Sequence, residues 1–238
     1  MATITSTHAR VEAPAQSSAE PAAGDQRVAF VGIGWDGYLA LLKVQGEKSR
    51  PQITYLAGEA HLMSPSPIHE RLGDRLGTFV RFLVVELGIP CEPTRETTFH
   101  RKQDDIGVQP DDSFYLANYR SIAAKDGKEA IDLEVDPPPD LVIEVVHTHP
   151  ATQAVEVLRR LRVPEIWVCK KDGLRFLVLG ADGQYVEASR SLSFPFLGPV
   201  EVFEWVARPG MASMTHWIIA LRQWVQEVLV PRARGQGG

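Results

Sequence analysis

The strongest constraint on the fold is one short run, residues 141–146, which reads Leu-Val-Ile-Glu-Val-Val. Apolar runs of this length, bounded by turn residues, are typical of strands that are buried on both faces of a sheet. Three consecutive prolines at 137–139 precede the run and mark a stop before it. The run therefore predicts a buried central strand, and it places one carboxylate, Glu144, where such a strand usually has Val or Ile.

Helical and strand-like patterns alternate on both sides of this run. Helices are expected from Trp35, over 72–87 with Gly88 closing the helix, over 152–161 and over 211–229. Strands are expected at 53–56, 60–63, near Cys91, at 97–100, 113–116, 165–169, 175–179 and 185–187, with a polar loop over 103–112. This order predicts an α/β (mixed α+β) fold with a central mixed β-sheet flanked by helices.

The 238 residues, 44% of them hydrophobic, are enough for one domain with appendages. Residues 1–27 are rich in Ala, Ser, Pro and Thr without an apolar period, so we expect a disordered leader. The folded domain is expected over 28–207. Residues 208–238 are expected to add a C-terminal helix and a frayed tail.

The bulk composition argues against several classes of protein. Two cysteines, Cys91 and Cys169, stand far apart without a metal-ligand spacing, so they are expected to be reduced thiols. No signal peptide and no membrane-spanning run is evident, which favours a cytoplasmic protein without a membrane partner. The net charge of -5 argues against coating nucleic acid through overall charge, so any contact with DNA has to be local or mediated by metal.

Glu144 has a counterpart upstream in Asp111, which follows Pro110 and opens a predicted strand. Two carboxylates on adjacent strands can share a Mg²⁺ ion, which takes oxygen ligands and keeps several waters. Alternatively, Asp111 caps a turn and Glu144 pairs with an arginine. Spacing alone leaves both interpretations open.

Five blocks of the sequence stand out in this order: GEAHLMSPSPIHERL (58–72), QPDDSFY (109–115), PPPDLVIEVV (137–146), VPEIW (163–167) and SLSFP (191–195). In this order they resemble one large bacterial family, the Uma-type putative restriction endonucleases of the PD-(D/E)xK superfamily. The resemblance covers about residues 30–207 and implies a restriction-endonuclease-like core.

The resemblance also implies a site. Asp111 and Glu144 would be the metal carboxylates for Mg²⁺ or Mn²⁺, DNA would be the substrate, and a homodimer is a possible assembly. His69 and Glu70 match a polar pair that would face the same cleft and join the catalytic residues. An alternative for this pair is a simple helix start, where an acidic residue is favourable near the positive end of the helix dipole.

The sequence departs from the family at one position that matters. The superfamily's lysine usually stands where Val146 is found, and Uma-type relatives move it to a helix position that corresponds to Ala154. The ammonium group is therefore missing. Arg159, Arg160, His147 and His149 are the nearby candidates to replace it.

Two functions follow as hypotheses. The first is a metal-dependent DNA endonuclease that hydrolyses phosphodiester bonds, with a site that the loss of lysine has altered. The second is a nuclease fold that has lost catalysis and serves as a binding or partner-interaction module. The missing lysine at Ala154 motivates the second.

Overall fold

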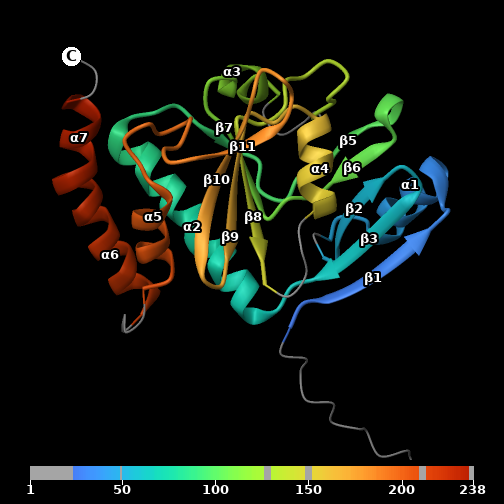
Figure 1. Ribbon diagram of the computed structural model, residues 1–238, viewed down its shortest axis with the longest axis horizontal. Helices are drawn as coiled ribbons and strands as arrows, with labels where there is room; N and C mark the ends of the chain where they lie inside the picture. The colour runs from blue at the N-terminus through green and yellow to red at the C-terminus, as the bar shows by residue number, and fades with distance from the viewer. Residues whose placement is uncertain (1–23, 49, 126–129, 148–151, 209–212, 236–238) are drawn as a thin grey trace, which may run out of the picture.

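The computed structural model describes residues 24–48, 50–125, 130–147, 152–208 and 213–235. Within these ranges the strands form two sheets, with helices packed on the outside and one helix between them (Figure 1). His149, one of the candidate cations, lies outside the described residues.

The first sheet has the strand order β1-β3-β2-β6-β5 and is antiparallel in the described part of the chain. Its β2–β3 hairpin turns at Ala57 and Gly58, whose φ angles of +47° and +87° fit the tight hairpin turns with left-handed residues. The strands are β1 (Gln26–Val31), β2 (Gln52–Leu56), β3 (Glu59–Ser64), β5 (Phe99–Arg101) and β6 (Ile106–Val108).

The second sheet has the order β11-β10-β9-β8-β7-β4 in the described residues. Only the β8–β9 pair is parallel, because the helix α4 (Thr152–Arg160) carries the chain from the end of one strand to the start of the next. The strands are β4 (Glu92–Pro93), β7 (Asp112–Tyr115), β8 (Leu141–Val146), β9 (Glu165–Lys170), β10 (Gly173–Leu179) and β11 (Tyr185–Ala188).

The helices cover three faces of these sheets. The long α2 begins with Ser66, whose Oγ accepts a hydrogen bond from the backbone N–H of His69, and ends at Gly88 in the left-handed conformation. The helices are α1 (Gly34–Gln45), α2 (Pro67–Leu87), α3 (Tyr119–Ala123), α4 (Thr152–Arg160), α5 (Pro199–Val206), α6 (Met214–Trp224), a π-helical turn (Val225–Leu229) and α7 (Val230–Gly235).

Alternation along β8 sorts its side chains between two cores. Ile143 and Val145 pack in the core formed with α2, α5 and α6, whereas Val142 and Val146 pack in the core formed with α4. Glu144 has the same parity as the second pair. Its carboxylate is therefore directed toward α4 and the first sheet.

The mixed α/β class and most predicted elements are confirmed, including the central strand and the helix that follows it. The single predicted sheet is in fact two. The loop predicted over 103–112 contains β6, and β1 and α5 were not predicted. The last helix, predicted as continuous over 211–229, is described from Met214 and passes into a π-helical turn at Val225.

The predicted leader boundary differs from the structure in one respect. β1 begins at Gln26, inside the segment that was expected to be disordered, and pairs with β3 along its whole length. The run 28–31 is apolar but only four residues long, and its side chains are exposed rather than packed in a core. Its order comes from the backbone of β3, a partner that the local sequence does not reveal.

Candidate active site

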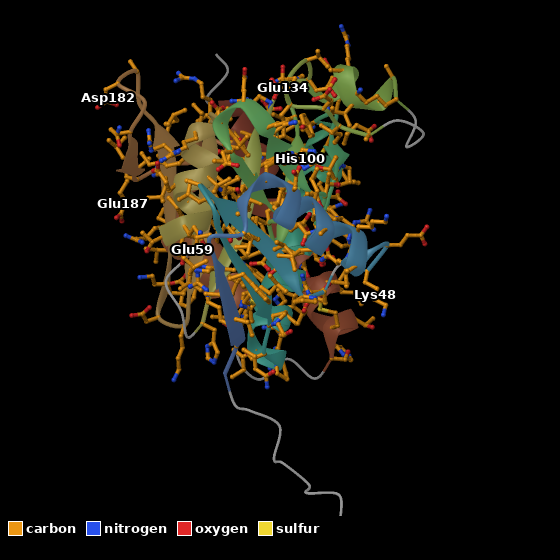
Figure 2. The ribbon with its side chains drawn as sticks, turned by 90° about the vertical axis from the view of Figure 1, so that its right-hand side faces the viewer. Lys48, Glu59, His100, Glu134, Asp182 and Glu187 are labelled. Carbon is orange, nitrogen blue, oxygen red and sulfur yellow. The ribbon has the colours of Figure 1, made fainter. Side chains whose placement is uncertain are left out.

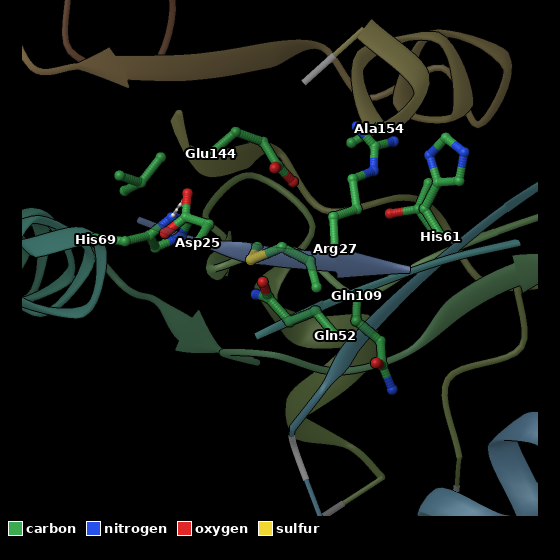
Figure 3. Close-up of a pocket in the computed structure, with 11 residues that line it drawn as sticks. Asp25, Arg27, Gln52, His61, His69, Gln109, Glu144 and Ala154 are labelled. Carbon is green, nitrogen blue, oxygen red and sulfur yellow. Dashed lines mark hydrogen bonds and ion pairs between the residues drawn. The ribbon is translucent and has the colours of Figure 1, made fainter. Parts of the chain in front are cut away.

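A cavity of about 60 Å³ lies between the two sheets, beside the first turn of α4 (Figure 3). This volume is enough for a few water molecules or a hydrated cation. Its lining comes from β1, β2, β3, the start of α2, the end of β8 and α4. The lining residues are Asp25, Arg27, Gln52, Thr54, His61, Met63, His69, Gln109, Glu144, Val145 and Ala154.

The first sheet supplies polar side chains to the cavity because its two faces have different roles. Arg27, Met63 and Gln52 are paired across β1, β3 and β2, so their side chains leave the sheet on the same face. The opposite face carries Ile53, Tyr55 and their neighbours, which pack against α1. Figure 2 views the molecule from the side of α1, which lies in front of the first sheet. The residues that line the cavity belong to the other face of that sheet.

Glu144 is the buried carboxylate of the site. It is 7% exposed, and its Oε1 atom has no hydrogen-bond partner among the described residues. Burial, and then the nearby charge of Asp111, raise the pKa of Glu144 well above its usual value. The alternative in which Glu144 pairs with an arginine finds no such ion pair in the described part of the chain.

Asp111 is held firmly beside Glu144. It stands one residue before β7, which pairs with β8, and its Oδ2 accepts a hydrogen bond of 2.7 Å from the backbone N–H of Val145. Its Oδ1 is 2.8 Å from Nε2 of Gln52 and 2.9 Å from Nε2 of His69. The structure thus places Asp111, just before β7, next to the part of β8 that carries Glu144, although Glu144 lines this cavity and Asp111 borders a neighbouring one.

His69 connects two carboxylates. Its Nε2 lies 2.9 Å from Oδ1 of Asp111, and its Nδ1 lies 3.2 Å from Oδ2 of Asp25. Burial by itself would lower the pKa of His69, but the hydrogen bonds and charges of Asp111 and Asp25 outweigh it and leave the pKa raised. His69 therefore contacts the candidate site directly, and the backbone of this residue is part of the helix start as well.

Glu70 is placed differently from His69. It is half exposed, and its Oε1 accepts a 2.8 Å hydrogen bond from Nε of Arg50. It lines a second cavity of about 100 Å³, which Asp111 and His69 also border and Glu144 does not. The predicted pair thus separates, with His69 next to both cavities and Glu70 next to one.

Of the cations expected to replace the missing lysine, the three that lie in the described part of the chain do not line the cavity. Arg159 and Arg160 both donate to Glu156, at 2.7 to 2.8 Å, on the far side of α4. His147 has a buried Nδ1 without a partner among the described residues and is not part of the lining. Ala154 does line the cavity, as expected for the position of the lost ammonium group.

Sequence reasoning missed Asp25, Arg27 and Gln52. The first two lay within the predicted leader, and Gln52 lies just before the predicted hairpin strand. A glutamine or an arginine next to a strand is common at a protein surface, so neither gave a local signal. Only the pairing of β1, β2 and β3 brings them to one cavity.

The residues present fit a divalent cation of the oxygen-binding type. Glu144 offers an unpartnered buried oxygen, and Oδ2 of Asp111 accepts one hydrogen bond although a carboxylate oxygen has two lone pairs. No group of three or more His, Cys, Asp or Glu side chains in the described part of the chain could by itself hold a metal ion. Mg²⁺ keeps several of its waters when it binds to a protein, so a site with two carboxylates suits this ion better than a complete cage of protein ligands would.

No helix among the described residues is long and apolar enough to cross a membrane.

The fold is that of a mixed α/β protein, and a solved structure shares it. The structure matches a solved structure from Anabaena variabilis, described as "a putative nuclease belonging to DUF820", with a TM-score of 0.51 and 18% sequence identity. The match covers 73% of this chain and 99% of the other. No curated protein matches the chain in sequence.

The sequence itself defines the family. Residues 35–208 match the family Uma2, whose description is "Putative restriction endonuclease". This match spans most of the chain. The protein belongs to the Uma2 family, and the resemblance seen in the ordered sequence blocks is confirmed.

Proposed function

We propose that the protein is a metal-dependent endonuclease that hydrolyses phosphodiester bonds of DNA, with Asp111 and Glu144 as the metal carboxylates. The observation that carries this proposal is the unpartnered Oε1 of Glu144 on the wall of a small cavity that several polar side chains line. A buried carboxylate without hydrogen bonds is costly, and a bound cation is one way to offset that cost. The match to a restriction endonuclease family supports the same reaction class.

Each residue of the site has a role in this proposal. When bound, a divalent ion would act as a Lewis acid that polarises the phosphoryl group. Gln52 and His69 hold Oδ1 of Asp111, and the N–H of Val145 holds Oδ2, so the carboxylate keeps one orientation. Such preorganisation is what a metal site requires from its surroundings.

Cleavage assays test the proposal directly. Supercoiled plasmid and single-stranded DNA are incubated with the protein in Mg²⁺, Mn²⁺ or Ca²⁺, beside Asp111→Ala, Glu144→Ala and the control Glu187→Ala. Glu187 is a suitable control because it is 61% exposed on β11, away from the cavity (Figure 2). We expect cleavage by the protein and the control, and at least about 100-fold less by the two site variants. No cleavage at high protein concentration, or cleavage unchanged in both site variants, would overturn the proposal.

A second candidate function is a binding module that retains the fold without catalysis. The alanine at position 154, on the cavity wall, is the observation in its favour. Calorimetric titration with Mn²⁺ separates the two candidates. Metal binding that depends on Asp111 and Glu144, together with no turnover, supports the module. If the protein shows no metal binding and no turnover, its role is purely structural.

A further inference from the structure

Arg27 is the inward-pointing residue of an otherwise exposed strand. Of the six residues of β1, it is the only one that is not exposed, and it pairs with Met63 of β3. Figure 3 shows its side chain extending from β1 toward the end of α4 that carries Ala154, with the carboxylate of Glu144 on a neighbouring wall. The sequence alone gave this arginine no role.

Arg27 is the only lysine or arginine among the residues that line this cavity in the described part of the chain. Among the described residues it donates one hydrogen bond, of 3.5 Å from Nη2 to Oε1 of Gln153, at the long limit for such bonds. A guanidinium has five N–H donors, so most of its donor capacity is open to a ligand. Burial lowers its pKa, while the charge of Glu59 raises it. Arginine nevertheless stays protonated at neutral pH.

Gln52, His69 and His61 of the cavity each have a hydrogen-bond partner, although the buried Nδ1 of His61 has none among the described residues. Gln52 donates to Asp111, and His69 lies between Asp111 and Asp25. His61 is 2.5 Å from Oε1 of Glu59 through its Nε2. A cavity with a buried carboxylate on one wall and a sparsely bonded cation on another offers complementary charge to a phosphate that shares a metal ion with the carboxylate.

We propose that Arg27 is the phosphate-binding residue of this site, donating hydrogen bonds to a non-bridging oxygen of the DNA phosphate next to Glu144. The inference rests on the proposed nuclease function. Arg27 would supply the positive charge that the family's lysine provides and that Ala154, at the corresponding position, does not. Arg27 acts by charge and hydrogen bonding, and transfers no proton. A purely structural alternative is that Arg27 only ties β1 to α4 through Gln153.

Four variants separate the two roles: Arg27→Ala, Arg27→Lys, the double variant Arg27→Ala with Ala154→Lys, and the control Arg175→Ala. Arg175 is a half-exposed arginine of β10 that does not line the cavity. Each is assayed for binding of a fluorescein-labelled DNA duplex in Ca²⁺ across salt concentrations, for single-turnover cleavage in Mg²⁺ and Mn²⁺, for Mn²⁺ affinity by calorimetry, and for thermal unfolding.

We expect Arg27→Ala to weaken duplex binding about 10-fold and to reduce the salt slope by about one phosphate contact. Cleavage should fall about 100-fold or more, while Mn²⁺ affinity stays within about twofold. Arg27→Lys should keep part of both activities, since it keeps the charge without the planar fork. The double variant should recover binding and cleavage because its new ammonium group enters the same cavity, although it cannot restore the contact of Arg27 with Gln153.

Two results would overturn the inference. In one, Arg27→Ala binds and cleaves as the control does. In the other, it loses binding only in proportion to a lower unfolding temperature, and Ala154→Lys restores nothing. If the unaltered protein binds the duplex but never cleaves it, the proposed function fails on its own. Duplex binding by Arg27→Ala, compared with that by the control, then still decides the role of Arg27. An unaltered protein that binds no DNA overturns both proposals.

Discussion

Asp111 and Asp112 are adjacent in sequence, yet their carboxylates take part in different structures. Asp111 is bound by Gln52, His69 and the N–H of Val145 at the candidate site. Asp112 turns toward α2, where its Oδ2 accepts a 2.7 Å hydrogen bond from Nη2 of Arg81. The alternation of a strand therefore assigns one carboxylate to the site and the other to the packing of α2 against the sheet.

Two glycines of α2 should respond in opposite ways to alanine. A Cβ at Gly77 would collide with the carboxylate of Asp112, whereas a Cβ at Gly73 would make ordinary contacts of 3.8 and 3.9 Å with Val145 and Asp111. We expect Gly77→Ala to destabilise the protein by about 1 to 3 kcal/mol from overpacking, partly offset by better helix propensity. Gly73→Ala should be neutral or stabilising by up to about 1 kcal/mol.

Urea unfolding of both variants measures these differences in the free energy of unfolding. The two substitutions gain the same helix propensity, so each serves as the control for the other. Equal effects of the two alanines would contradict the packing of Gly77 against Asp112.

The two cysteines should be unreactive in the folded protein. Burial, as the largest cause, raises the pKa of both Cys91 and Cys169 to about 12, from an ordinary 9.0. Because the thiolate is the reactive form, and its fraction grows only as the pH approaches the pKa, labelling at pH 8 should be about 1000-fold slower than for an ordinary thiol. Labelling by an aromatic disulfide reagent, with and without urea, measures this. Rapid labelling of the folded protein at pH 8 would contradict the burial of these groups.

His69 should titrate above its ordinary value in metal-free protein. Burial favours the neutral ring, but the hydrogen bonds and charges of Asp111 and Asp25 favour the cation more strongly and raise the pKa above 6.5. The imidazolium should thus persist to a higher pH than in an unfolded chain. Nuclear magnetic resonance titration of the ring protons checks this, and Asp111→Asn should lower the midpoint. A midpoint that is the same in this variant would show that Asp111 does not govern the ring.

Glu165 should be essential to the fold, because its buried carboxylate joins two family blocks. It accepts hydrogen bonds from the backbone N–H groups of Leu192 and Ser193 and from Nε1 of Trp167, at 2.8 to 3.1 Å. Glu165→Ala leaves these three donors unpaired, and we expect it to cost about 3 to 5 kcal/mol of stability. Chemical denaturation is the measurement.

The exposed Glu187 provides the contrast for this prediction. Its ion pair with Arg175 spans 3.8 Å at the surface, and Glu187→Ala should change stability by less than about 1 kcal/mol. A loss in Glu165→Ala no larger than in Glu187→Ala would refute the anchoring role.

The sequence by itself determined the elements with strong local patterns, and it singled out Glu144 as a carboxylate within a buried strand. The apolar run around Glu144 has the composition of a buried strand, and the long apolar face of α2 ends at a glycine, so both follow from periodicity and turn chemistry. Glu144 stood out because a carboxylate within such a run is costly, which is a property of one short segment.

The tertiary structure alone decided how the cavity is built. β1 and β6 are short strands that pair with neighbouring backbones, and their short local patterns did not identify those partners. Arg27 and Gln52 reach one cavity because pairing with β3 directs them to the same face of the first sheet, and α4 places Ala154 opposite. Pairing between distant segments depends on contacts that a local stretch of sequence does not contain. The sequence therefore did not predict that Arg27 lines the cavity.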